Sequence, residues 1–176
     1  RGVTCTIHRG ERIALIGHNG AGKSTLFLLL SGLQPSWSGE VYLHGQLIRP
    51  QERVSLRQQV ALVLQNSNYQ LFTPSIEDEI AFGLKNMGLR EAELHKRLEE
   101  LLTRYNLAEL RHKPPHELSE GQKKWVALVA VLATDPEVLI LDEPTAALDA
   151  LYTERVLDLL EQLHLAGKTI IISTHD

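Results

Sequence analysis

A glycine-rich segment near the start of the chain has the residue types that bind phosphate. It fits the pattern G-x-x-x-x-G-K-S/T and consists of Gly17, His18, Asn19, Gly20, Ala21, Gly22, Lys23, Ser24 and Thr25. Glycines in such a loop let backbone N–H groups wrap around phosphate oxygens, and the helix that follows adds its positive N-terminal dipole. The lysine can reach the outer phosphates of a nucleotide, and the serine hydroxyl can ligate Mg2+. A strand pattern before the loop and a helix pattern after it disfavour the alternative, a glycine turn with no ligand.

Two adjacent carboxylates follow an apolar run later in the chain. Residues 138–141 are all apolar and predict a buried strand, and Asp142 and Glu143 come directly after them. Ligands bind beyond the C-terminal ends of strands in open α/β sheets. There Asp142 could hold Mg2+, and Glu143 could be the general base for a water that attacks a γ-phosphate. The alternative is a solvated acidic turn before Pro144, which the phosphate-binding pattern elsewhere in the chain disfavours.

A third segment, Leu118-Ser119-Glu120-Gly121-Gln122, precedes a helical pattern. Ser119 is a favourable N-cap for that helix. A capped helix start that contains a glycine can also bind an anion. Taken alone, this segment does not indicate catalysis.

Apolar runs of two kinds separate these polar segments. Runs typical of strands span residues 12–16, 41–43, 60–64, 138–141 and 169–172. Helical periodicity spans residues 23–33, 91–105, 120–133 and 151–165, and in the first of these Leu26, Leu29, Leu30 and Leu33 share one face. Residues 34–39 indicate a turn. Strands alternating with helices predict an α/β fold with a mostly parallel sheet covered on both faces.

Residues 66–117 are more polar than the rest and mostly helical in pattern. We therefore expect a core made of residues 1–65 and 118–176, with a helical subdomain at 66–117.

The sequence begins without a methionine and stops just after the last predicted strand. Because a strand edge is a poor place for a domain to end, we expect a piece of a longer protein.

The composition of the 176 residues excludes several classes of protein. The formal net charge of −4 gives no basic surplus, so we expect no nucleic-acid partner. The one cysteine, Cys5, excludes a disulfide framework, and we expect it to be buried on an early strand. No signal peptide opens the sequence, and no apolar run approaches the ~20 residues that cross a bilayer. Any link to a membrane is therefore expected to come through a partner.

Taken together and in order, the motifs are similar to those of ABC transporter nucleotide-binding domains. The phosphate loop is followed by Gln65 after an apolar strand, by the LSEGQ segment at 118–122, by LILDEP at 139–144, by Ala147-Leu148-Asp149 and by His175. The resemblance covers essentially the whole chain, and its five-residue signature at 118–122 is specific to this family. It implies a phosphate-loop NTPase core with a helical signature subdomain, and ATP and Mg2+ as ligands.

The resemblance also implies that two such cassettes close face to face, with ATP between the phosphate loop of one and the signature of the other. Ser119 and Gly121 would then contact the γ-phosphate bound by the opposite cassette. Asp149 would communicate across the same interface.

Two further roles follow from the same resemblance. Gln65 would sense Mg2+ and the attacking water and pass the nucleotide state to residues 66–117. His175 would contact the γ-phosphate and orient the water together with Glu143. His112 and His116 match no motif, and we expect both at the surface.

The sequence departs from the family pattern in four places. Glu120 replaces the commoner second glycine of the signature, and Ala147 replaces a frequent glycine. Trp125 stands where arginine is common, which leaves open whether it packs locally or makes a surface contact. The aromatic residue that stacks on adenine has no candidate among residues 1–12.

Residues 65–72, 76–83 and 122–124 are similar to those of the ATPases of cobalt and nickel importers, in the energy-coupling-factor group that also imports vitamins. This resemblance implies a second ATPase subunit, a transmembrane coupling subunit and a substrate-binding membrane subunit, at the cytoplasmic face of the membrane. Leu71 and Phe72 are then either core residues or a docking surface for a membrane protein's cytoplasmic helix, and both can hold.

Two other classes remain as alternatives. A non-transport ABC ATPase of DNA repair would carry long coiled coils between Lys23 and Ser119, where no heptad run occurs. One of translation would carry a second cassette in tandem. A phosphate-loop kinase is disfavoured by the signature and by Glu143.

Overall fold

Four parallel strands form the sheet that positions the candidate site. The computed structural model describes residues 2–34 and 38–175, so residues 35–37 of the predicted turn lie outside the described residues. The strands are β1 (Arg12–Ile16), β4 (Val60–Val63), β5 (Val138–Asp142) and β6 (Thr169–Thr174). Their order is β1-β6-β5-β4, and all three neighbouring pairs are parallel. The predicted α/β fold with a mostly parallel sheet is therefore confirmed.

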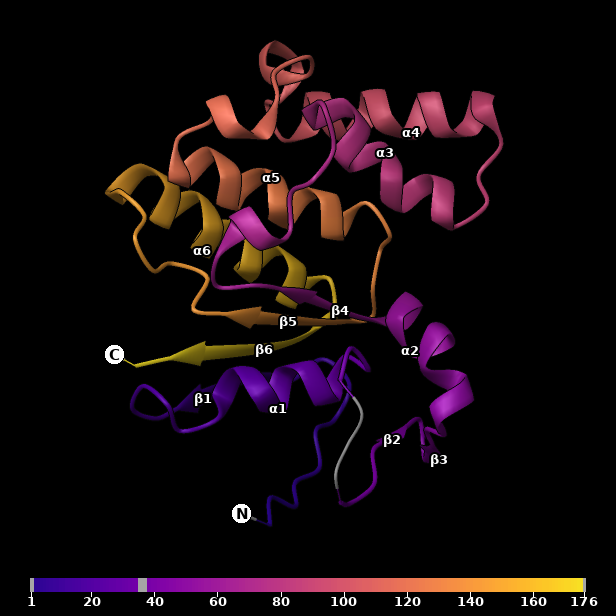
Figure 1. Ribbon diagram of the computed structural model, residues 1–176, viewed down its shortest axis with the longest axis vertical. Helices are drawn as coiled ribbons and strands as arrows, with labels where there is room; N and C mark the ends of the chain where they lie inside the picture. Colours follow the sequence, from indigo (N-terminus) through magenta and orange to yellow (C-terminus); the bar gives the residue numbers. More distant parts are fainter. Residues whose placement is uncertain (1, 35–37, 176) are drawn as a thin grey trace.

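Helices cover both faces of this sheet (Figure 1). They are α1 (Lys23–Leu30), α2 (Arg53–Gln59), α3 (Ile76–Asn86), α4 (Glu91–Arg104), α5 (Glu120–Leu132) and α6 (Ala150–Leu165). α5 and α6 lie on one face with α3 and α4 stacked beyond them, and α1 lies on the other face. The short strands β2 (Tyr42–Leu43) and β3 (Gln46–Leu47) form a separate antiparallel hairpin.

Alternate residues of each buried strand belong to different cores, as the pleat of a strand requires. Leu139, Leu141 and Ile170 join a large core with α3 to α6. Ile140 and Ile171 point the other way and pack with residues of α1 and α2. Because both faces of these two strands are covered, residues 138–141 of β5 and 170–172 of β6 are all apolar.

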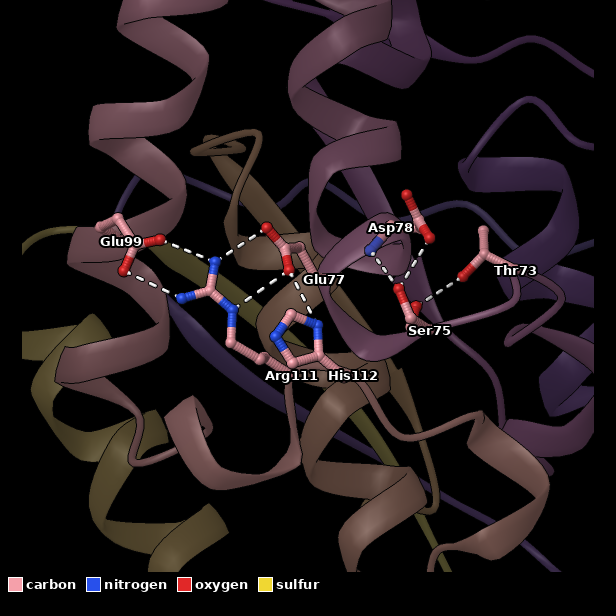
Figure 2. A network of polar contacts seen from close by, with 7 residues as sticks. All are labelled: Thr73, Ser75, Glu77, Asp78, Glu99, Arg111 and His112. Carbon is pink, nitrogen blue, oxygen red and sulfur yellow. Dashed lines mark hydrogen bonds and ion pairs between the residues drawn. The ribbon is translucent and has the colours of Figure 1, made fainter.

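The helical region between β4 and α5 is fastened by a polar network (Figure 2). Arg111, in the loop before α5, donates to Glu77 of α3 at 2.8 and 3.1 Å and to Glu99 of α4 at 2.7 and 3.3 Å. His112 Nδ1 lies 3.5 Å from a Glu77 oxygen. One guanidinium thereby joins α3, α4 and the segment that leads into the signature.

The first helix is shorter than predicted, because Gly32 adopts a left-handed φ of +69°. The N–H groups of Gly32 and Leu33 then turn back to the carbonyls of Leu29 and Leu28 and close the helix end. Leu33 is 52% exposed, and Phe27, which the leucine pattern did not include, is the apolar residue of α1 that is buried. Leu30 packs partly buried against the same core as Phe27, so the predicted leucine face holds at Leu30 and was wrong at Leu33.

Two further expectations differ from the structure. Cys5 is exposed and lies in an extended segment before β1, without a strand around it, so its predicted burial was wrong. The helix α2 was not predicted, because its seven residues are polar apart from Val54 and Leu56. His112 and His116 are exposed, as expected. Among the described residues, no helix is long and apolar enough to cross a membrane.

Candidate active site

Four of the predicted site residues follow the C-terminal ends of the four parallel strands. Gly17 follows β1, Glu143 follows β5, His175 follows β6 and Gln65 comes two residues after β4. The register pairs Ile16 with Thr174, Asp142 with Ser173 and Val63 with Leu141. The four strand ends are thus level at one edge of the sheet, where α/β folds bind ligands.

The phosphate loop folds as its pattern predicts. Gly20 and Gly22 adopt φ values of +79° and +94°, which side chains with a Cβ rarely tolerate, and Gly22 leads directly into α1. Lys23 is buried, and its ammonium donates to the backbone carbonyls of Gly17 at 2.6 Å and His18 at 3.3 Å. The lysine head is therefore held inside the curve of the loop.

Glu143 is the centre of a cluster drawn from all four strand ends. Its side chain is only 9% exposed. The Gln65 amide donates to Glu143 Oε2 at 2.8 Å, and Lys23 Nζ lies 3.8 Å from Oε1. His175 Nδ1 lies 3.3 Å from the same Oε1. These contacts orient the carboxylate, as a general base for an attacking water would require.

Ser173 fixes the backbone around the two carboxylates. It is fully buried, and its hydroxyl donates to Asp142 Oδ1 at 2.5 Å and accepts from the N–H of Glu143 at 2.9 Å. Glu143 has a left-handed φ of +46°, a strained conformation that this contact helps to hold. Sequence reasoning missed Ser173, although a serine at the end of an isoleucine run was the available signal.

The donor set fits Mg2+. The three expected ligands are the hydroxyl of Ser24, the carboxylate of Asp142 and the amide oxygen of Gln65, and all are oxygens, which Mg2+ prefers. Since the nitrogen of the Gln65 amide faces Glu143, its oxygen is the atom left to ligate a metal. No group of three or more His, Cys, Asp or Glu side chains suited to a metal occurs among the described residues. Mg2+ does not require one, because it commonly uses one or two carboxylates with waters and substrate phosphates.

Three predicted site residues lie at helix starts, where their hydrogen bonds are local. The Ser119 hydroxyl accepts from the N–H of Gln122 at 3.2 Å, and the Gln122 side chain accepts from the N–H of Ser119 at 3.0 Å. Asp149 caps α6 by accepting from the N–H of Tyr152 at 2.8 Å. Gly121 is buried at the start of α5. The N-cap role of Ser119 is confirmed.

Lys124 was not predicted as a site residue, yet it contacts one. Its side chain is buried, and its ammonium donates to the backbone carbonyls of Leu64, at 3.1 Å, and of Gln65. Burial lowers the pKa of Lys124, because the charged form loses its hydration. No sequence pattern signals this contact, since a lysine beside Lys123 on a helix suggests a solvated face.

Trp125 packs locally, which answers the question that the sequence left open. Its ring is 8% exposed and meets Tyr105 edge to face, with centroids 5.9 Å apart. The indole N–H donates to the Tyr105 carbonyl at 3.0 Å. Trp125 thereby joins α5 to the end of α4.

The sequence allowed two interpretations of Leu71 and Phe72, as core residues or as a docking surface, and the structure places one residue in each situation. Leu71 is buried in the large core, whereas Phe72 is 67% exposed. Phe72 meets Phe82 of α3 edge to face at 5.0 Å, and Phe82 is itself 45% exposed. The two rings form an exposed aromatic pair on the helical region.

Comparison with known proteins decides the family. A sequence model described as "ABC transporter" matches residues 1–146. The chain belongs to the ABC transporter family. It corresponds to the ATP-binding domain of these proteins, as the order of its motifs predicted.

Relatives of this ABC domain are described as ATP-binding proteins of transporters. An energy-coupling factor transporter ATP-binding protein, EcfA, of Methanocaldococcus jannaschii is 44% identical over 178 residues, which cover 100% of this chain and 64% of the relative. An EcfA of Carboxydothermus hydrogenoformans is 43% identical, over 99% of this chain and 65% of the relative. The chain therefore spans just under two thirds of the length of these relatives.

Solved structures agree with the fold. CbiO1 of Clostridium perfringens, described as part of the ABC transporter complex CbiONQ, is 41% identical with a TM-score of 0.86, over 100% of this chain and 71% of that one. A dimeric ATP-binding cassette in a post-hydrolysis state, bound to ADP and Pi, is 29% identical with a TM-score of 0.89, over 100% of this chain and 79% of that one. The ABC ATPase fold is thus confirmed.

Proposed function

We propose that this chain is the ATP-binding and ATP-hydrolysing part of an ABC importer of the energy-coupling-factor type. The observation that carries the proposal is the convergence of Lys23, Gln65 and His175 on the carboxylate of Glu143. The EcfA relatives and the CbiO1 structure support the importer type. The cargo in this proposal is cobalt, nickel or a vitamin.

In the proposed reaction the phosphate loop binds the phosphates of ATP through its inward N–H groups, and Lys23 exchanges its carbonyl partners for phosphate oxygens. Glu143 accepts a proton from the attacking water. Gln65 and His175 orient that water and the γ-phosphate against the base. Mg2+, held by Ser24, Asp142 and Gln65, would neutralise charge on the phosphates when bound.

A second cassette completes the site in this proposal. Ser119 and Gly121 of the opposite copy would contact the γ-phosphate, since the N-terminus of α5 favours an anion. Asp149, at the start of α6, would carry the state of one site to the other. The second subunit is either another copy or a related ATPase.

The membrane partners enter through a protein contact at the cytoplasmic face. The aromatic pair Phe72 and Phe82 is the proposed docking surface for a helix of the transmembrane coupling subunit. An exposed aromatic pair of this kind is typical of contact surfaces. A further membrane subunit would bind the cargo.

The variant Glu143→Gln tests the catalytic assignment in the complete protein assembled with its membrane partners. We expect ATP binding to stay within about twofold and hydrolysis to fall by roughly 100-fold or more, the usual share of a general base. Glu137→Gln, just before β5 at the opposite end of the strand, is the matched control and should hydrolyse normally. Near-normal turnover by Glu143→Gln would remove Glu143 from its role. Hydrolysis that the membrane subunits do not influence would favour an ABC ATPase outside transport.

A further inference from the structure

The buried lysine on α5 is an unusual feature of the region around Gln65. Lys124 is 4% exposed, although burying a cation is costly unless hydrogen bonds replace its hydration. The replacements here are two backbone carbonyls, those of Leu64 and Gln65. Lys123, its neighbour, instead pairs with a side chain, the exposed carboxylate of Glu120, at 2.8 Å.

A second side chain ties the same backbone to α5. Gln70 accepts from the N–H of Leu64 at 3.0 Å and donates to the carbonyl of Ala127 at 3.3 Å. Both polar groups of Leu64 are therefore bound, one directly by a residue of α5 and one through Gln70. The backbone that leaves β4 is thus fixed to α5.

The side chain of Gln65 continues this connection toward the reaction centre. Its backbone carbonyl accepts from Lys124, and its side-chain amide donates to Glu143 Oε2 at 2.8 Å. α5 begins with the signature residues Glu120, Gly121 and Gln122, so Lys124 lies one helical turn beyond the start of the helix. The signature helix and the candidate base are therefore joined through a single residue.

We propose that Lys124 is a positioning residue, which sets the backbone of Gln65 relative to the signature helix and so decides whether the Gln65 amide reaches Glu143. This inference rests on the proposed ATP hydrolysis. Lys124 binds the backbone carbonyl of Gln65 and not its side chain. A movement of α5 would therefore shift the backbone of Gln65, while its side-chain amide could still donate a hydrogen bond to Glu143. Nucleotide sandwiched at the signature would then adjust the geometry at Glu143.

The main variant is Lys124→Met, which keeps an unbranched side chain and removes the donors. Lys123→Met is the matched control one position earlier. In the complete assembled protein we expect Lys124→Met to lower kcat about tenfold, a change of ~1.4 kcal/mol in the barrier. The KM for ATP should stay within about twofold, because the phosphate loop is untouched. Lys123→Met should match the wild type in both constants.

A double-mutant cycle with Gln65→Ala separates positioning from a general loss of structure. If Lys124 acts through the Gln65 side chain, Lys124→Met should lower kcat less than about twofold further in the Gln65→Ala background. An equal loss in both backgrounds would overturn the proposal, since it would mean that the lysine acts independently of Gln65. An unchanged kcat for Lys124→Met would overturn it as well.

Separate control measurements test whether each variant folds and whether the protein has the proposed function. The thermal midpoint of each variant is measured, and if Lys124→Met does not fold, Lys124→Gln takes its place in the cycle, because its polar amide lacks the positive charge and is one atom shorter than the lysine side chain. Wild-type protein must hydrolyse ATP, and Glu143→Gln must hydrolyse it roughly 100-fold more slowly, which tests the proposed function itself. Wild-type hydrolysis together with additive effects of Lys124 and Gln65 would refute only the positioning role.

Discussion

A Cβ atom on Gly121 would stand 2.5 Å from Cδ2 of Tyr152 and 2.9 Å from its Cγ. Real Cβ atoms do not approach so closely, so the ring of α6 occupies the space that the glycine leaves. The signature glycine therefore has a packing role between α5 and α6, in addition to any contact with nucleotide. We expect Gly121→Ala to lower the free energy of unfolding by about 1–3 kcal/mol, the usual cost of overpacking.

Tyr152→Ala tests this packing role independently of nucleotide. With the ring removed, Gly121→Ala should no longer destabilise, and the higher helix propensity of alanine should stabilise by up to about 1 kcal/mol. Chemical unfolding of the four proteins of this cycle, without ATP, measures the coupling. The same destabilisation by Gly121→Ala in both backgrounds would show that Tyr152 is not the obstacle.

Ala147 has a left-handed φ of +61°, a conformation that favours glycine. An alanine in this region is strained by about 1 kcal/mol or more, while glycine is not. We expect the free energy of unfolding of Ala147→Gly to be no more than about 0.5 kcal/mol below that of the wild type, and it could be higher. Glycine increases the entropy of the unfolded chain, but it also relieves the strain at this position, and the two effects offset each other.

Ala92→Gly is the comparison for that prediction. Ala92 is an exposed residue of α4, where glycine carries the entropic cost and relieves no strain, so its variant should lose about 0.5 kcal/mol. Thermal and urea unfolding of both variants provide the measurement. A loss at Ala147 as large as that at Ala92 would mean that the left-handed alanine carries no strain.

The convergence of the site could be predicted from sequence, because parallel strands bring their C-terminal ends to one edge. Glu143 comes two residues after an apolar run, as its pattern predicted, whereas Gln65 and His175 were indicated only by the resemblance to ABC nucleotide-binding domains. The face of α1 could not be predicted in the same way. Residues 26–30 are all apolar, so periodicity did not distinguish Phe27 from the leucines around it.

Contacts that long side chains make across the fold could not be predicted from the sequence. Lys124 reaches the carbonyls after β4 because α5 packs over that strand, and nothing in the local pattern indicates this direction. Cys5 shows the opposite error: cysteine is usually buried, but here the segment before β1 leaves it exposed. The packing of Trp125 could not be predicted either, because it depends on where Tyr105, at the end of another helix, lies in the fold.

The ion pair of Glu77 with Arg111 predicts a dependence of stability on pH. The hydrogen bonds from Arg111 lower the pKa of Glu77, with smaller contributions from Arg111, His112 and His95 as nearby charges. A carboxyl group whose pKa is lowered by folding stabilises the fold at pH values above its pKa in the unfolded chain, which is about 4.3 for Glu. This stabilisation is lost as the pH falls through the pKa of the group in the folded protein. Glu99 of α4 faces the same guanidinium and competes for it.

Glu77→Gln should therefore destabilise the domain at pH 7, by up to about 1 kcal/mol since the pair is partly exposed. The difference from the wild type should shrink as the pH falls below about 4. Urea unfolding at several pH values measures it, with Glu93→Gln on the exposed surface of α4 as the control. A gap that stays constant down to acid pH would show that the Glu77 charge contributes nothing.

The aromatic pair of Phe72 and Phe82 predicts where the membrane partner binds. Glu79 accepts hydrogen bonds from the N–H groups of Phe72 and Thr73, both at 3.0 Å, so the exposed ring is carried on a fixed backbone. Leu71, one residue earlier, is buried and would report on folding instead. Substitutions at these neighbouring positions therefore separate docking from core packing.

We expect Phe72→Ser with Phe82→Ser to abolish transport and recruitment to membranes that carry the transmembrane subunits, while ATP binding and the thermal midpoint stay near those of the wild type. Large aromatic side chains at the centre of an interface commonly contribute about 2 kcal/mol or more, so losing two should lower the affinity by roughly 100-fold or more. Leu157→Ser, at an exposed leucine of α6, is the matched control and should bind normally. Co-fractionation with membranes, run beside a nucleotide-binding titration, measures both properties. Intact recruitment of the double variant would place the docking surface elsewhere, and loss of ATP binding together with recruitment would mean that the two rings support the fold.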